Sequence, residues 1–146
     1  MKTQNPNFRE NVRRIFESAP FLDSLGLKLS DLGPGWCESA IAIRQKHLQQ
    51  DGYIHAGVQA TMADHTAGGA GGTVIRHDQT VLTIEFKINL LRPASGDRLR
   101  CRGTVLRAGK TIIVAESEVF AWKDGEEKLA AKATVTLAVV PQRTEA

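Results

Sequence analysis

The sequence lacks the features that mark several large classes of protein. Its 146 residues include only two cysteines, Cys37 and Cys101. These are too few for a disulfide framework and too far apart for a metal-binding pair, so we expect two reduced structural thiols. No run approaches the roughly 18 apolar residues that a membrane span requires, and the first residues, MKTQNPNFRENVRR, contain no apolar signal-peptide core. We therefore expect a cytoplasmic protein without a membrane segment.

The chain also lacks a strong excess of one charge. Its 19 basic and 16 acidic residues leave a net charge of +3, which suits an anionic small ligand but not a nucleic-acid partner. The four histidines are not spaced as metal ligands, so no metal is expected. With 42% hydrophobic residues and no repeat, the chain predicts one domain over 1–146. Within it we expect an N-terminal helix and connection at 1–25 and a tail at 141–146.

The most informative stretch runs from His55 to Ile75, HAGVQATMADHTAGGAGGTVI. Between Asp51 and Arg76 its only acid is Asp64. Each of its four clustered glycines disfavours a free helix by about 1 kcal/mol relative to alanine, so a helix here needs other elements wrapped around it. A buried carboxylate is costly unless it is hydrogen-bonded or used. The stretch therefore predicts a buried helix in which Asp64 is the first functional candidate.

Shorter elements precede this helix. Asn5 and Pro6 are typical of a helix start, and the apolar residues that follow define a short amphipathic helix. We expect Pro20 to end that helix and residues 20–26 to form a turn-like connection. The segments LKLSDL and WCESAIAI, separated by Gly-Pro-Gly, predict a hairpin, and residues 44–53 a polar loop.

After the central helix the hydrophobic period changes to two. Apolar residues alternate with polar ones along 82–90, which predicts a half-buried strand with one apolar face: Leu82, Ile84, Phe86, Ile88 and Leu90. Three more alternating segments follow, joined by turns at 92–96, 108–109 and 124–125. Hairpin-length connections imply antiparallel pairing. The fold class is therefore α+β, with one curved antiparallel sheet of about six strands wrapped around a long central helix.

This order of elements, with a glycine-rich helix opened by His-x-Gly, resembles the hotdog fold. More narrowly, HAGVQATMAD followed by LTIEFKINLLRPA looks like the acyl-CoA thioesterases of the phenylacetate-degradation (PaaI-like) type, within the 4-hydroxybenzoyl-CoA thioesterase superfamily. The resemblance covers residues 25–140 and rests on the combination of motifs, because His-x-Gly alone is common. It implies hydrolysis of acyl-CoA thioesters, with no cofactor beyond the coenzyme A of the substrate.

The resemblance also implies roles for individual residues. Asp64 matches the catalytic carboxylate, Gln49 a loop residue that holds the thioester or the water, and His55 the histidine of the motif. Ala56 matches the position whose backbone N–H polarises the thioester carbonyl. The family usually has glycine there, but alanine still supplies the N–H. Thr83 matches a hydroxyl residue on the following strand.

Simple helix geometry adds an independent constraint. Ala56 and Gly57 open the helix, where free N–H groups and the positive end of the helix dipole favour an oxygen that gains negative charge. Asp64 lies eight residues later, roughly 12 Å along the axis, which is too far for both ends to act on one carbon atom. A site that uses both must therefore borrow one of them from a second subunit. The resemblance implies the same, because hotdog proteins form homodimers with two sites across the interface, here combining Gln49, His55 and Ala56 of one chain with Asp64 and Thr83 of the other. A dimer of dimers is the expected assembly.

Each role has a simpler alternative. Asp64 could be a structural carboxylate bonded to a neighbouring hydroxyl, and Thr83 could reflect strand propensity alone. His55 could either orient the loop or contact the substrate. Gln50 could replace Gln49. His65 is expected in the core or an interface rather than as a base, and the clustered glycines are expected to serve close helix packing rather than phosphate binding.

Substrate-binding residues are less well defined. Arg92, with Arg98, Arg100 and Arg102, forms a basic strip that either contacts the coenzyme A phosphates or is an ordinary solvated strand face. An aromatic wall for the acyl group could come from Tyr53, Trp36 and Phe86. The acyl identity and the choice between coenzyme A and acyl carrier protein stay open.

The predicted function is acyl-CoA hydrolysis with Asp64 as nucleophile or general base. The alternatives are an enoyl-thioester hydratase or dehydratase of the same fold and a non-catalytic acyl-thioester binding domain.

Overall fold

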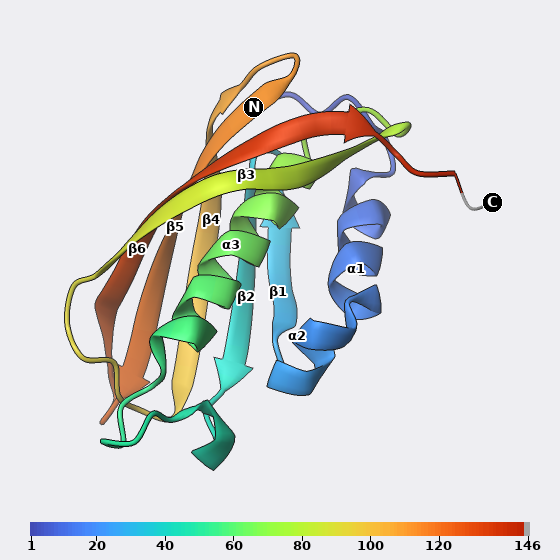
Figure 1. Cartoon of the computed structure of the whole chain (residues 1–146). Helices are drawn as coiled ribbons and strands as arrows, with labels where there is room; N and C mark the ends of the chain where they lie inside the picture. Colours follow the sequence, from blue (N-terminus) through green and yellow to red (C-terminus); the bar gives the residue numbers. More distant parts are fainter. Residues whose placement is uncertain (145–146) are drawn as a thin grey trace.

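A curved six-stranded antiparallel sheet wraps around one long helix (Figure 1). The computed structural model describes residues 1–144. Its elements are α1 (Phe8–Ser18), α2 (Pro20–Leu25), β1 (Lys28–Gly33), β2 (Trp36–Ala42), the 3-10 turn η1 (Gln45–His47), α3 (Ala56–Gly72), β3 (Gln79–Leu90), β4 (Arg98–Ala108), β5 (Ile112–Lys123) and β6 (Glu126–Pro141). The strand order is β1-β2-β4-β5-β6-β3. This confirms the predicted hotdog architecture. No helix among the described residues is long and apolar enough to cross a membrane.

The N-terminal segment differs from the prediction in detail. The first helix starts at Phe8 after Asn7, and Pro20 begins a second short helix instead of leading into a turn. A proline fits the first helical position because its missing N–H has no intrahelical partner there. Gly26, at φ +72°, then ends α2 in a left-handed conformation that glycine adopts readily. Helix α1 packs on α3 and β1.

Close packing explains most of the glycines in α3. A Cβ atom at Gly69 would lie 2.7 Å from the Phe16 ring, and one at Gly71 would lie 2.7 Å from Leu137 Cδ1. On the sheet side, a Cβ atom at Gly103 of β4 would lie 2.6 Å from the carbonyl oxygen of Thr66. Small residues on both surfaces therefore let the helix backbone approach the sheet, as the sequence predicted.

The predicted buried helix is buried along most of its surface, but one face of α3 is not covered. Besides Ala56 and His65, the partly or fully accessible residues of α3 recur every three or four positions: Gly57, Ala60, Thr61, Asp64 and Gly68. A Cβ atom at Gly68 would meet nothing within 4 Å. The sheet covers only one side of the helix, and Asp64 lies on the side that it leaves open.

Strand β3 forms one edge of the sheet and contains a bulge between Thr83 and Glu85. Before the bulge Thr83 pairs with Leu137, and after it Phe86 pairs with Val135, both of which are buried partners. A bulge shifts the alternation by one residue. The predicted single apolar face of this strand is therefore wrong. Thr83 and Phe86 share the helix side, and residues on both faces of this edge strand are exposed, notably Leu82 (60%), Ile84 (57%), Phe86 (41%) and Leu90 (49%).

Candidate active site

The first turn of α3 is built around His55. This residue is the N-cap, and its Nδ1 accepts a hydrogen bond of 2.7 Å from the N–H of Gly57. The contact supports the orienting role considered for His55, because a side chain that caps a helix also holds the loop leading into it. It also engages the Gly57 N–H within the chain, so the prediction that Gly57 binds the substrate would have to rest on its other atoms. The Ala56 N–H has no hydrogen-bond partner among the described residues.

The loop before α3 is held by its own side chains. Gln49 Oε1 accepts hydrogen bonds from the N–H groups of Asp51 and Tyr53, and the Gln49 N–H donates to the Tyr53 carbonyl at 2.8 Å. Buried His47, which the sequence did not single out, accepts from the Arg44 N–H and contacts the Leu25 carbonyl at 2.8 Å. The Gln49 amide nitrogen takes part in none of these bonds, which leaves it as a donor for a ligand.

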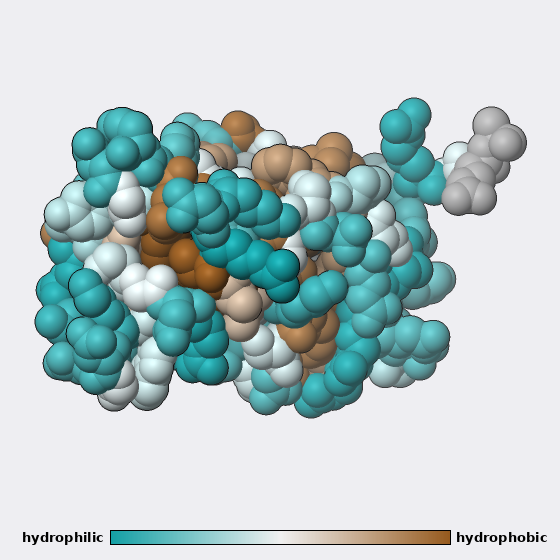
Figure 2. Space-filling view, turned by 90° about the horizontal axis from the view of Figure 1, so that it is seen from below, coloured by the Kyte–Doolittle hydropathy of each residue, from teal (hydrophilic) through white to brown (hydrophobic). Residues whose placement is uncertain are grey.

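A groove of about 540 Å³ runs past the start of α3. Five of the predicted site residues line it: Gln49, Tyr53, His55, Ala56 and Arg92. The other lining residues are Gln50, Ile54, Gln59, Leu90, Leu91, Pro93 and Ala94. Figure 2 views the molecule from this end and shows hydrophobic surface recessed between hydrophilic groups. Of the aromatic residues considered for an acyl wall, only Tyr53 lines the groove. Trp36 lies under the guanidinium of Arg102 instead.

Gln59 is a groove residue that the sequence did not indicate. Its side chain is only 3% exposed, and its Nε2 donates to the Ile54 carbonyl at 3.3 Å. Its Oε1 has no hydrogen-bond partner among the described residues. A long polar side chain among the mostly small and apolar residues at the start of the helix was the available signal. In the structure it ties α3 to the loop that enters it.

Asp64 and Thr83 form a second centre away from this groove. The Thr83 hydroxyl donates to Asp64 Oδ1 at 2.7 Å, and neither residue lines the groove. Pairing with buried Leu137, immediately before the bulge in β3, places Thr83 on the helix side of the strand. The sequence assigned both residues to the same chain, and the structure joins them within one chain. The carboxylate is accessible rather than buried, contrary to the prediction.

His65, the neighbour of Asp64, faces the core. Its ring meets Phe16 edge-on with centroids 4.6 Å apart, and its Nε2 is buried without a partner among residues 1–144. Burial lowers the pKa of His65, and the nearby Asp64 carboxylate only partly offsets this effect. His65 is therefore a core residue, as predicted.

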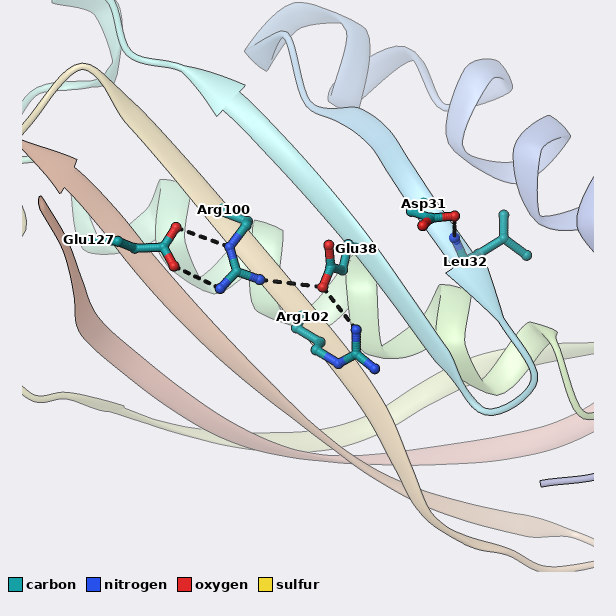
Figure 3. A network of polar contacts seen from close by, with 6 residues as sticks. All are labelled: Asp31, Leu32, Glu38, Arg100, Arg102 and Glu127. Carbon is teal, nitrogen blue, oxygen red and sulfur yellow. Dashed lines mark hydrogen bonds and ion pairs between the residues drawn. The ribbon is translucent and has the colours of Figure 1, made fainter. Parts of the chain in front are cut away.

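Arg100 and Arg102 of β4 point to the sheet face opposite α3 and are ion-paired there (Figure 3). Arg100 binds Glu127 at 2.8 and 3.0 Å, and Arg102 binds Glu38 at 2.9 Å. Each guanidinium also lies over an aromatic ring, at 4.5 Å for Arg100 and 4.3 Å for Arg102. Arg92 lies apart from them, in the groove. Arg98 of the predicted strip lies over the Trp122 ring at 5.6 Å. The predicted basic strip is therefore not one surface, and Arg100 and Arg102 are the ion-paired part of its β4 face.

Comparison with known proteins identifies the family. A model of the thioesterase superfamily matches residues 51–128, more than half of the chain. The chain belongs to the thioesterase superfamily. A thioesterase family protein from Silicibacter pomeroyi is 35% identical, with a TM-score of 0.90 over 92% of this chain and 99% of that one.

Two further relatives of this superfamily member carry named activities. A thioesterase from Haemophilus influenzae is 25% identical, with a TM-score of 0.80 over 90% of each chain. A 1,4-dihydroxy-2-naphthoyl-CoA hydrolase from Listeria monocytogenes is 25% identical over 83% of this chain and 96% of its own. Family membership supports hydrolysis of thioesters as the general class of activity.

Proposed function

We propose that this thioesterase-superfamily protein hydrolyses acyl-CoA thioesters to free coenzyme A and a carboxylic acid. The observation that carries the proposal is the Ala56 N–H at the head of the groove, which has no hydrogen-bond partner within residues 1–144. A helix N-terminus combines free N–H groups with the positive end of the dipole, which favours the oxyanion of a tetrahedral intermediate. The relative named as a naphthoyl-CoA hydrolase supports coenzyme A as the carrier.

Asp64 acts in the hydrolysis either as a general base or as a nucleophile. As general base it takes a proton from water while the water oxygen bonds to the thioester carbon. Collapse of the intermediate then breaks the C–S bond, and the proton passes to the leaving thiolate. As nucleophile it forms a mixed anhydride and releases the thiolate, and water then cleaves the anhydride. The Thr83 hydrogen bond orients the carboxylate in both schemes.

The two centres belong to different subunits in this proposal. Asp64 lies eight residues after Ala56, roughly 12 Å along the helix axis, and does not line the groove of its own chain. A partner that covers the open face of α3 brings its own groove to Asp64. Strand β3 supports such a partner, because it is a sheet edge with exposed Leu82 and Ile84, and an unpaired edge is a template for another strand. Two such dimers form the expected tetramer.

Replacing the carboxylate tests the chemistry. Asp64→Asn keeps the size of the side chain and an oxygen that accepts from Thr83, but it removes the base or nucleophile. We expect kcat to fall by about 10²–10⁴-fold on a panel of acyl-CoAs. Asp23→Asn, a matched change in α2, should leave kcat unchanged. An Asp64→Asn protein as active as the parent contradicts the proposal.

Mixing two inactive variants tests the shared site. Ala56→Pro removes the N–H of one centre and Asp64→Asn the carboxylate of the other. When equal amounts refold together, half of the dimers are mixed and each mixed dimer contains one intact site, so about a quarter of the parent activity returns. Sites confined to one chain recover nothing.

A separate variant tests the edge. Ile84→Lys should shift the mass in light scattering to that of one chain, whereas Leu106→Lys, similarly exposed on β4, should not.

A further inference from the structure

A second pocket lies beside the groove, on the other side of segment 92–94. It has a volume of about 270 Å³ and is bounded by the β3–β4 loop and the β5–β6 hairpin. Arg92, Pro93 and Ala94 line both hollows. By volume the second pocket holds about nine waters, which is room for a hydrated phosphate group. The two hollows therefore give a bound molecule a path from the start of α3 to this pocket.

The pocket collects cations from parts of the chain that are distant in sequence. Arg92 comes from the β3–β4 loop, Lys123 from the end of β5 and Lys128 from β6. Backbone bonds hold the loop against the hairpin, at 2.8 Å from the Leu91 N–H to the Ala130 carbonyl and at 3.1 Å from the Asp97 N–H to the Trp122 carbonyl. The three cationic side chains thus belong to backbone segments that are hydrogen-bonded to one another.

These cations are available for an external anion, unlike the ion-paired Arg100 and Arg102 of β4. Arg92 has no ion-pair partner among the described residues, and Lys123 contacts only the neutral Ser95 hydroxyl, at 3.4 Å. Lys128 is 3.9 Å from Glu126, and both side chains are more than half exposed. An exposed pair at that distance holds its ammonium group weakly.

We propose that the pocket lined by Arg92, Lys123 and Lys128 binds phosphate groups of coenzyme A and so selects coenzyme A thioesters over thioesters on acyl carrier protein. The inference rests on the proposed function, since the groove must hold the thioester for the carrier to reach this pocket. Arg92 offers a planar fork that pairs with two phosphate oxygens, and the lysines add compact positive charges. Asp124 and Glu126 also line the pocket and oppose anion binding.

The test compares one acyl group on coenzyme A, on dephospho-coenzyme A and on pantetheine. For the double variant Lys123→Gln/Lys128→Gln we expect the KM for acyl-CoA to rise about two- to tenfold with kcat unchanged. The KM for acyl-pantetheine should not change, and the acyl-CoA effect should shrink in 0.5 M salt. The matched control, Arg107→Gln/Lys110→Gln, removes two charges from the β4–β5 hairpin at the other end of the sheet and should leave every KM unchanged.

A gain of affinity provides the opposite check. Glu126→Gln removes an opposing charge from the pocket and should lower the KM for acyl-CoA but not for acyl-pantetheine. Isothermal titration with free coenzyme A reports the same affinity differences without turnover.

Three results separate the two proposals. Equal KM values for acyl-CoA and acyl-pantetheine, with hydrolysis intact, overturn the phosphate pocket alone. A lysine-dependent KM for acylated carrier protein but not for acyl-CoA also overturns it. If no thioester is hydrolysed, the proposed function fails, and the titration still decides whether the pocket binds coenzyme A.

Discussion

Ala56→Pro is the sharpest test of the candidate active site, because it removes one hydrogen-bond donor while suiting the backbone. Ala56 is the first residue of α3, a position that proline favours. The preceding residue, His55, has φ −60° and ψ 138°, which lies in the extended region required before a proline. No hydrogen bond of the protein is lost, because the Ala56 N–H has no partner among the described residues.

Stability and catalysis should therefore move in opposite directions. Proline in a compatible position stabilises by about 0.4–1 kcal/mol, which corresponds to a rise in melting temperature of roughly 1–4 °C for a chain of this size. Loss of one oxyanion donor should cost about 2.7–4 kcal/mol in the transition state, a fall in kcat of about 10²–10³-fold.

Release of free thiol from an acyl-CoA measures kcat, and thermal unfolding measures stability. Two control variants separate the effect of losing the Ala56 N–H from the effect of the volume of the proline ring. Ala56→Gly keeps the N–H and removes the side chain, and Ala56→Val keeps the N–H and adds volume. Both should keep kcat within about tenfold of the parent, less than the loss expected for one missing donor. A folded Ala56→Pro protein with the kcat of Ala56→Val would falsify the assignment of the N–H to the oxyanion.

Three further predictions concern neighbouring features. Thr83→Val removes the hydrogen bond to Asp64 and should lower kcat about tenfold, whereas Thr83→Ser should restore it, both measured by thiol release. Gly103→Ala places a methyl group against the Thr66 carbonyl and should destabilise the fold by about 1–3 kcal/mol in urea unfolding, and an unchanged midpoint contradicts the close approach. Burial lowers the pKa of His65 below its usual 6.5, so the unfolded chain binds a proton at this residue more readily than the folded chain does. The contribution of His65 to the free energy of unfolding is therefore complete above pH 6.5 and falls as the pH decreases below that value. His65→Leu should remove this part of the pH dependence of unfolding.

Local patterns in the sequence determined the architecture and half of the candidate site. The His-x-Gly start, the small residues and the isolated Asp64 marked α3, because helix starts and hydrophobic periods are read from neighbours in the chain. The position of Ala56 at the helix start followed from the same signals. Gln49 and His55 entered through the family resemblance, and both lie in the groove.

Tertiary pairing decided the rest. The register of β3 with β6 placed Thr83 beside Asp64, and the bulge that follows Thr83 depends on the partner strand rather than on local alternation. The His55 ring accepts a hydrogen bond from the Gly57 N–H, a contact that the spacing of the residues in the sequence did not indicate. Lys123 and Lys128 reached the side of Arg92 because β5 and β6 return the chain to the β3–β4 loop. The sequence thus determined which residues could act, and long-range register decided which of them meet, because contacts between distant segments leave no periodic signal in either segment.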